Sequence, residues 1–283
     1  MEQGINLGYV MFRRNSVELR PLLEAVRLCK VAGFTEYDYL GPWSGDDFLE
    51  IAKRSRETFD SEGVHIHQTH CPFFRYKENG IGLFSKAAPR AIEISAVLGA
   101  KYMVIHADEW PMADTPYSCG LAVRKNYEIV APIVEVCRKN NVTPVFENVF
   151  DEGRANGDNG RDRFGAVADE LLALLDMFGK GETGICLDTG HAYVSAKEKI
   201  LDFVRKVAPY VLCTHVHDNK SSSDLHQPAF AGTIPMEEIF AILKENGYGG
   251  NLTWEMVYGR YPDQILPDFL ALLHKSGQYL GAH

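Results

Sequence analysis

The stretch FGAVADELLALLDMFGKGETGICLDT, residues 164–189, joins a helix pattern to a short apolar run. In its first half, apolar residues recur at spacings of three and four, and Gly179 closes the pattern as a helix C-cap would. The run GICLDT at residues 184–189 has the length and apolar character of a buried strand. The stretch therefore predicts one helix–strand unit of an α/β fold.

The same alternation extends over the whole chain. Strand-like runs occur at residues 5–11, 34–40, 64–70, 102–107, 143–148, 184–189, 210–217 and 251–257. Amphipathic helix patterns lie between them, as in SVELRPLLEAVRLCKVAG at residues 16–33. Eight strand–helix units in 283 residues average about 35 residues each, the repeat of a (β/α)8 barrel. We predict an α/β fold with a single (β/α)8 TIM barrel domain over residues 1–283.

An open doubly wound sheet is the alternative architecture, but no G-x-G-x-x-G motif follows the first strand-like run. One long polar and glycine-rich stretch, VFDEGRANGDNGRDR at residues 149–163, is predicted to be a loop. A loop of this length inside a compact domain is usually functional or disordered.

Composition and charge narrow the classes of partner. The chain is 46% hydrophobic, as expected of a globular protein, and its formal net charge of −9 argues against a nucleic-acid partner. It has no apolar run of 18 residues, and its N-terminus lacks a basic segment followed by a long apolar one. We therefore expect no membrane association and a cytoplasmic location. The six cysteines occur singly, which predicts reduced thiols.

Polar side chains that can bind a metal end six consecutive predicted strands. They are His70, His106, Glu147, Asp188, His215 and Glu255. In a barrel of this type, the C-terminal ends of the strands form one rim, which carries the active site. Gathering so many imidazoles and carboxylates there without a cation would cost several kcal/mol. The pattern predicts a divalent metal, and mixed His and carboxylate ligands favour zinc or manganese over calcium.

Two loops offer further ligands. His191 follows Asp188 by three residues at the mouth of the sixth strand. After the seventh strand, CTHVHDNKSSSDLHQPAFAG at residues 213–232 places Asp224 and His226 as a D-x-H pair beyond a serine-rich segment. We expect this loop to fold back over the metal site.

Four motifs resemble the metal signatures of the xylose isomerase-like TIM barrel superfamily: FEN (146–148), CLDTGHAY (186–193), HVHDNKSSSDLH (215–226) and WEM (254–256). That superfamily contains sugar and sugar-phosphate isomerases and epimerases, together with the endonuclease IV family of DNA-repair enzymes, and the resemblance covers essentially the whole chain. For the epimerase-type members it implies one ion held by Glu147, Asp188, His215 and Glu255. The endonuclease IV pattern implies three ions and adds His70, His106, His191, Asp224 and His226.

The resemblance implies a sugar or sugar-phosphate isomerase or epimerase that removes a proton next to a carbonyl. Such chemistry needs a base and an acid on opposite sides of the substrate. Glu147 and Glu255 would provide them from strands three apart around the barrel, and His191 would position a substrate oxygen.

We also predict substrate contacts by His217, Trp43, Phe73 and Arg154. For His217, orientation of His215 is an equal alternative. For the two aromatic residues the alternative is core packing, and for Arg154 it is a solvated loop.

The main alternative function is a zinc phosphodiesterase of the endonuclease IV kind, an AP endonuclease. The complete ligand set favours it, whereas 38 acidic residues against 29 dispersed basic ones argue against a DNA groove. A dehydratase on the same scaffold would begin with the same proton abstraction. The sequence leaves open which sugar is used, whether it is phosphorylated, whether one or three ions bind, and whether the chain forms a homo-oligomer.

Overall fold

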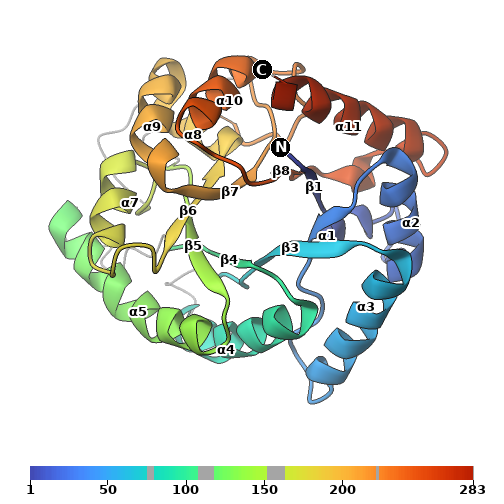
Figure 1. The fold of residues 1–283 in the computed structure, drawn as a ribbon, viewed down its shortest axis with the longest axis horizontal. Coiled ribbons are helices and arrows are strands. Elements are labelled where there is room, and N and C mark those ends of the chain that lie inside the picture. Colours follow the sequence, from blue (N-terminus) through green and yellow to red (C-terminus); the bar gives the residue numbers. More distant parts are fainter. Residues whose placement is uncertain (75–79, 108–117, 152–162, 221–222, 283) are drawn as a thin grey trace.

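A computed structural model describes residues 1–74, 80–107, 118–151, 163–220 and 223–282, in which strands and helices alternate around a ring (Figure 1). The strands are β1 (Gln3–Asn6), β2 (Glu36–Asp38), β3 (His65–His70), β4 (Tyr102–Ile105), β5 (Thr143–Glu147), β6 (Gly184–Asp188), β7 (Val211–His215) and β8 (Leu252–Trp254). The α-helices are α1 (Leu7–Val10), α2 (Leu22–Ala32), α3 (Phe48–Glu62), α4 (Gly80–Leu98), α5 (Cys119–Lys139), α7 (Ala168–Leu175), α8 (Thr189–Ala196), α9 (Ile200–Val207), α10 (Met236–Glu245) and α11 (Leu266–Ala282). Short 3-10 helices are η2 (Lys197–Lys199), η3 (Ala208–Tyr210) and η4 (Tyr258–Arg260).

The eight strands are all parallel and lie in the order β7-β6-β5-β4-β3-β2-β1-β8. The ring closes between β7 and β8, where the backbone N–H of Val216 donates to Thr253 and the N–H of Glu255 donates to Val216. The predicted single-domain (β/α)8 barrel is confirmed. Because every strand is parallel, the residues that end the strands share one rim.

The prediction for the first strand was wrong in its boundaries. The run at residues 5–11 was expected to be one strand, but β1 ends at Asn6 and residues 7–10 form α1. Asn6 is extended, and its side-chain oxygen accepts a hydrogen bond from the backbone N–H of Tyr9 at 3.2 Å. An Asn cap of this kind starts a helix, and an apolar tetrapeptide suits a buried helical turn as well as a strand.

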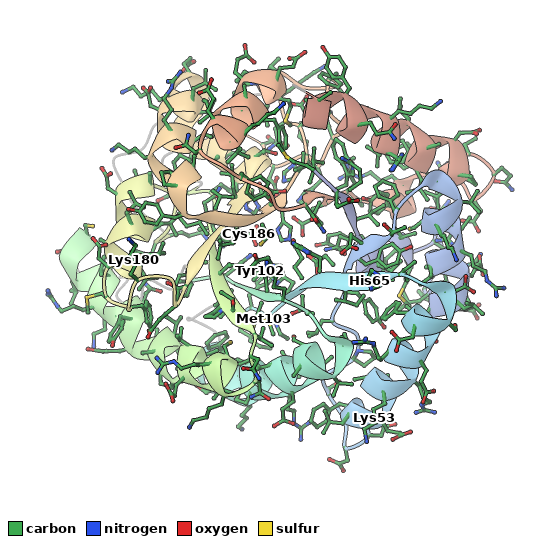
Figure 2. All side chains as sticks on the ribbon, viewed as in Figure 1. Lys53, His65, Tyr102, Met103, Lys180 and Cys186 are labelled. Carbon is green, nitrogen blue, oxygen red and sulfur yellow. The ribbon has the colours of Figure 1, made fainter. Side chains whose placement is uncertain are left out.

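Successive residues of a strand point alternately into the barrel and outward to the layer between the strands and the helices. On β4, Tyr102 and Val104 point into the barrel, where they meet Cys186 and Cys213, whereas Met103 belongs to the core between strands and helices. Figure 2 places Tyr102 and Cys186 within the ring of strands. None of the cysteines in the described residues is part of a disulfide. No helix in the described part of the chain has the length and apolar character needed to cross a membrane.

His67 on β3 is a partly buried histidine away from the rim. Its ring packs edge-on against Tyr102 at 5.2 Å, and its Nε2 has no hydrogen-bond partner among the described residues. Burial, assisted by the nearby Lys101 ammonium, lowers the pKa of His67 from 6.5 to about 4. The imidazole is therefore neutral in the folded protein at pH values where the unfolded chain is protonated.

His67→Phe should flatten the pH dependence of stability. Between the folded pKa of about 4 and the unfolded value of 6.5, the unfolded chain binds more protons, so His67 makes stability rise with pH. The effect is at most about 3 kcal/mol and is complete above the unfolded pKa. Urea unfolding of the metal-free protein across this window measures it. His65→Gln, at an exposed position of the same strand, is the control. A wild-type slope in His67→Phe would contradict the assignment.

Candidate metal centre

The ends of four neighbouring strands bring four ligand-bearing side chains together. Glu147, Asp188 and His215 end β5, β6 and β7, and Glu255 follows β8 directly. One ligand atom from each lies within 4.8 Å of the others, and none of the four residues is more than 6% exposed. This is the epimerase-type set that the resemblance assigned.

Asp188 is fixed where β6 turns into α8. Its Oδ1 caps α8 by accepting a hydrogen bond from the backbone N–H of His191 at 2.6 Å. The buried Asn148 side chain donates to the Asp188 carbonyl and accepts from the Asp188 N–H, both at 2.9 Å. The carboxylate is therefore held by its own cap and by a clamp on its backbone.

Glu147 lies at the centre of the cluster. Its Oε1 is 3.2 Å from His215 Nδ1 and 3.3 Å from His191 Nδ1. Burial alone would raise the pKa of the Glu147 carboxyl, but the His215 and His106 imidazoles hold that pKa well below its usual range. Glu147 is therefore ionised at neutral pH, as a ligand or a general base must be.

His215 presents one nitrogen to the carboxylates and the other to a buried aspartate. Its Nδ1 is 3.6 Å from Glu255 Oε2, and its Nε2 is 3.0 Å from Asp38 Oδ2. Burial alone would lower the pKa of His215. The carboxylates of Glu255 and Glu147 raise it by more, so the pKa lies well above its ordinary value.

A second group of ligand atoms adjoins Glu147. His70 ends β3 and His106 follows β4, and their Nε2 atoms lie 3.1 and 3.0 Å from Glu147 Oε2. The His70 Nδ1 lies 2.8 Å from the carbonyl oxygen of Cys71, which is suited to accept its proton. With that proton assigned to Nδ1, Nε2 is free to bind a cation at this point.

A third group lies on the other side of Asp188, where His191, His217, Asp224 and His226 place one ligand atom each within 4.8 Å of the others. Within this group, His226 Nε2 is 3.1 Å from Asp224 Oδ2. His191 Nδ1 is 3.0 Å from the Asn148 carbonyl oxygen and His226 Nδ1 is 2.9 Å from that of Glu255. Donation to these carbonyls leaves both Nε2 atoms directed at Asp224.

His217 faces the carboxylates. It is fully buried, and its Nε2 is 3.1 Å from Asp188 Oδ2 and 3.7 Å from Asp224 Oδ1. A Cβ at position 190 would overlap the His217 ring, so Gly190 is needed for this approach. The His217 side chain therefore contacts Asp188, whereas the alternative prediction had it orienting His215.

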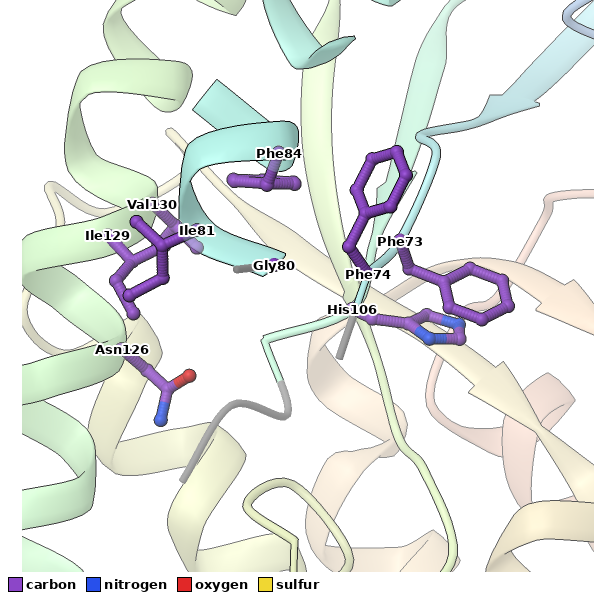
Figure 3. A pocket seen from close by; sticks show the side chains of 9 residues that line it. All are labelled: Phe73, Phe74, Gly80, Ile81, Phe84, His106, Asn126, Ile129 and Val130. Carbon is purple, nitrogen blue, oxygen red and sulfur yellow. The ribbon is translucent and has the colours of Figure 1, made fainter. Parts of the chain in front are cut away.

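The predicted substrate-contact residues lie in different settings. Phe73 is 59% exposed and stacks on His106 at a ring-centroid distance of 4.5 Å. Trp43 packs edge-on against Phe74. Figure 3 shows Phe73 beside His106 at the edge of a pocket whose far wall carries apolar side chains and the amide of Asn126. Arg154 lies outside the described residues.

Sequence reasoning missed two residues of the centre, Asp38 and Asn148. Asp38 ends β2 just as the ligand residues end their strands, and that position was the available signal. Asn148 lies within the FEN motif, directly after Glu147. Both hydrogen-bond to ligand-bearing residues and are not among the predicted ligands themselves.

The fold and site define a (β/α)8 barrel with a candidate metal centre at the carboxyl ends of its strands. The chain belongs to the xylose isomerase-like TIM barrel family, whose model matches residues 26–275. The uncharacterized protein MJ1311 of Methanocaldococcus jannaschii is 25% identical over 190 residues, which are 66% of this chain and 62% of that protein. The chain thus matches less than two thirds of this relative's length.

Solved structures similar to the chain include sugar epimerases. A D-tagatose 3-epimerase-like protein has a TM-score of 0.76 and 21% identity, covering 100% of this chain and 98% of its own. D-psicose 3-epimerase, solved in the presence of D-fructose, has a TM-score of 0.71 and 14% identity, with both chains covered completely. The IolI protein with a bound zinc atom has a TM-score of 0.72 and 12% identity, covering 100% of this chain and 98% of its own. At these identities the similarity shows a shared fold.

Asn148→Ala should destabilise the protein by about 2 to 4 kcal/mol, because it leaves the buried N–H and carbonyl of Asp188 without their partners. Urea unfolding of the metal-free protein measures the loss. The control is Asn140→Ala, at the partly buried residue that follows α5. Its side-chain nitrogen donates to the carbonyl of Val136, and a loss below about 1 kcal/mol is expected. Equal losses in the two variants would contradict the clamp.

Proposed function

We propose that the chain is a divalent-metal-dependent epimerase or isomerase of a small sugar or sugar derivative. The observation that carries this proposal is the convergence of Glu147, Asp188, His215 and Glu255 within 4.8 Å at the barrel rim. Family membership and the structural similarity to sugar epimerases support it.

The donor set fits zinc or manganese. Three carboxylates and an imidazole are ligands that both ions accept. His215 Nδ1 is buried without a hydrogen-bond partner among the described residues, beside two carboxylates that would repel each other. A cation at this point would satisfy the nitrogen and offset the repulsion. When bound, such an ion polarises a substrate carbonyl and makes the adjacent C–H bond more acidic.

Glu147 and Glu255 are the proposed acid and base. They come from β5 and from the end of β8, so they approach a substrate from different sides of the barrel mouth. One carboxylate removes the proton next to the carbonyl, and the other carboxyl group returns a proton on the opposite face, which inverts that carbon. His191, held by Asn148, is placed to hydrogen-bond a substrate oxygen.

The walls around the centre suit a small polar substrate. Phe73 offers an exposed ring beside His106 that can pack against the apolar face of a sugar. Trp43 and Arg154 remain proposed substrate contacts. For His217, which is buried against Asp188, we propose an effect on the substrate through Asp188.

Epimerisation in deuterium oxide should place deuterium at the inverted carbon, because the returning proton comes from a carboxyl group in exchange with solvent. Manganese- or zinc-loaded protein would be incubated with D-fructose, D-tagatose and D-psicose, and the products followed by NMR.

Glu255→Gln should lower the turnover by at least about a hundredfold and weaken metal binding, with unfolding stability near that of the wild type.

Glu170→Gln is the matched control, since Glu170 is buried on α7 and accepts a hydrogen bond from the backbone N–H of Gly165. It should keep wild-type turnover. Wild-type-like activity in Glu255→Gln, or an epimerised product without deuterium, would contradict the proposed mechanism.

The two flanking groups favour a second candidate, a zinc phosphodiesterase of the endonuclease IV kind. His70 and His106 share Glu147 with the central set, and the His191 group contacts Asp188 through His217. Three clustered ions could activate a water molecule for attack on phosphorus and stabilise the leaving oxygen. The net charge of −9 argues against a DNA duplex as the substrate.

Metal removal separates the two candidates. We expect a chelator to abolish sugar epimerisation and manganese or zinc to restore it, while a duplex with an abasic site stays uncut. Elemental analysis of the reloaded protein counts the ions per chain. Three zinc ions together with cleavage of the duplex would support the phosphodiesterase and contradict the epimerase.

A further inference from the structure

We infer that Asp38 is a positioning residue that fixes the ring orientation and the protonated nitrogen of His215 for metal binding. This inference rests on the proposed function, in which His215 is a metal ligand. Asp38 ends β2, and its Oδ2 lies 3.0 Å from His215 Nε2. Asp38 is 1% exposed and His215 is not exposed at all. In such an environment the contact is a hydrogen bond that water does not replace.

This contact assigns a separate task to each nitrogen of the imidazole. A carboxylate can only accept, so Nε2 of His215 carries the proton and donates it to Asp38. Nδ1 faces the space beside Glu147 and Glu255, from whose oxygens it lies 3.2 and 3.6 Å, and there a bound cation would replace its proton. An imidazole that donates to a carboxylate is a stronger metal ligand with a fixed ring orientation.

Asp38 is itself held by a buried chain of hydrogen bonds. The Gln68 side-chain nitrogen donates to Asp38 Oδ2 at 3.3 Å, and the Thr253 hydroxyl donates to the Gln68 side-chain oxygen at 3.2 Å. Gly4 on β1 leaves room for that hydroxyl, since a Cβ there would lie 2.7 Å from Thr253 Oγ1. The chain therefore runs through β2, β3 and β8 before it reaches the ligand on β7.

The Asp38–His215 contact exists because the strands close into a ring, which brings the ends of β2 and β7 near each other. On one side of the ring, β1 and β8 separate β2 from β7, so Asp38 reaches His215 across the barrel mouth. The two residues are 177 positions apart in sequence. Among the described residues, Asp38 is not one of the groups whose ligand atoms converge on a metal position, which distinguishes it from Glu147 and Glu255.

The test compares Asp38→Asn with the control Glu170→Gln, which removes a buried carboxylate elsewhere. Zinc affinity is measured by competition with a chromophoric chelator, and the His215 Nε2 proton is followed by NMR with histidine labelled with nitrogen-15, in both the metal-free and the zinc-loaded protein. We expect Asp38→Asn to lower zinc affinity by about 10- to 100-fold and to shift the Nε2 proton upfield. Glu170→Gln should change neither.

Wild-type zinc affinity in Asp38→Asn, or equal losses in both variants, would overturn the positioning role. An unshifted Nε2 proton would overturn it as well. If the wild-type protein binds neither zinc nor manganese, the proposed function fails and the positioning role fails with it. The metal-free NMR spectrum then still shows whether the Asp38–His215 hydrogen bond exists, so the two failures are distinguishable.

Discussion

Buried carboxylates that face one another at the barrel rim repel each other, and the side chains around them are arranged to offset that repulsion. Glu147, Asp188 and Glu255 converge at a barrel rim where burial weakens the screening of charge. Imidazoles lie between them, and the low pKa of Glu147 with the high pKa of His215 reflects that pairing. Such an arrangement is unfavourable unless positive charge is supplied, which a divalent cation does most compactly.

Hydrogen bonds from the surrounding backbone and side chains hold this unfavourable cluster in place. Backbone carbonyls of Asn148 and Glu255 accept hydrogen bonds from His191 and His226, so the Nε2 atoms of both histidines face Asp224. The Asp188 backbone is clamped by Asn148. Each support comes from a strand end or the residue next to it, and rigid strand ends therefore preorganise the site before any ligand arrives.

The sequence predicted the barrel and the rim because both follow from local patterns. Strand-like runs at regular intervals fixed the eight parallel strands, and their last polar residues, from His70 to Glu255, then had to share one rim. Two kinds of feature were out of reach. The end of β1 depends on a single hydrogen bond that the Tyr9 backbone N–H donates to the Asn6 side chain, which periodicity does not detect. The Asp38–His215 and His217–Asp188 contacts depend on how distant strands and loops face each other in the closed ring.

We propose that Glu147, Asp188, His215 and Glu255 hold one divalent ion at the barrel rim. Anomalous diffraction from crystals grown with zinc, and separately with manganese, would locate such an ion. We expect an anomalous peak roughly 2 Å from a ligand atom of each of these four residues. Loaded crystals without a peak at this position would contradict it.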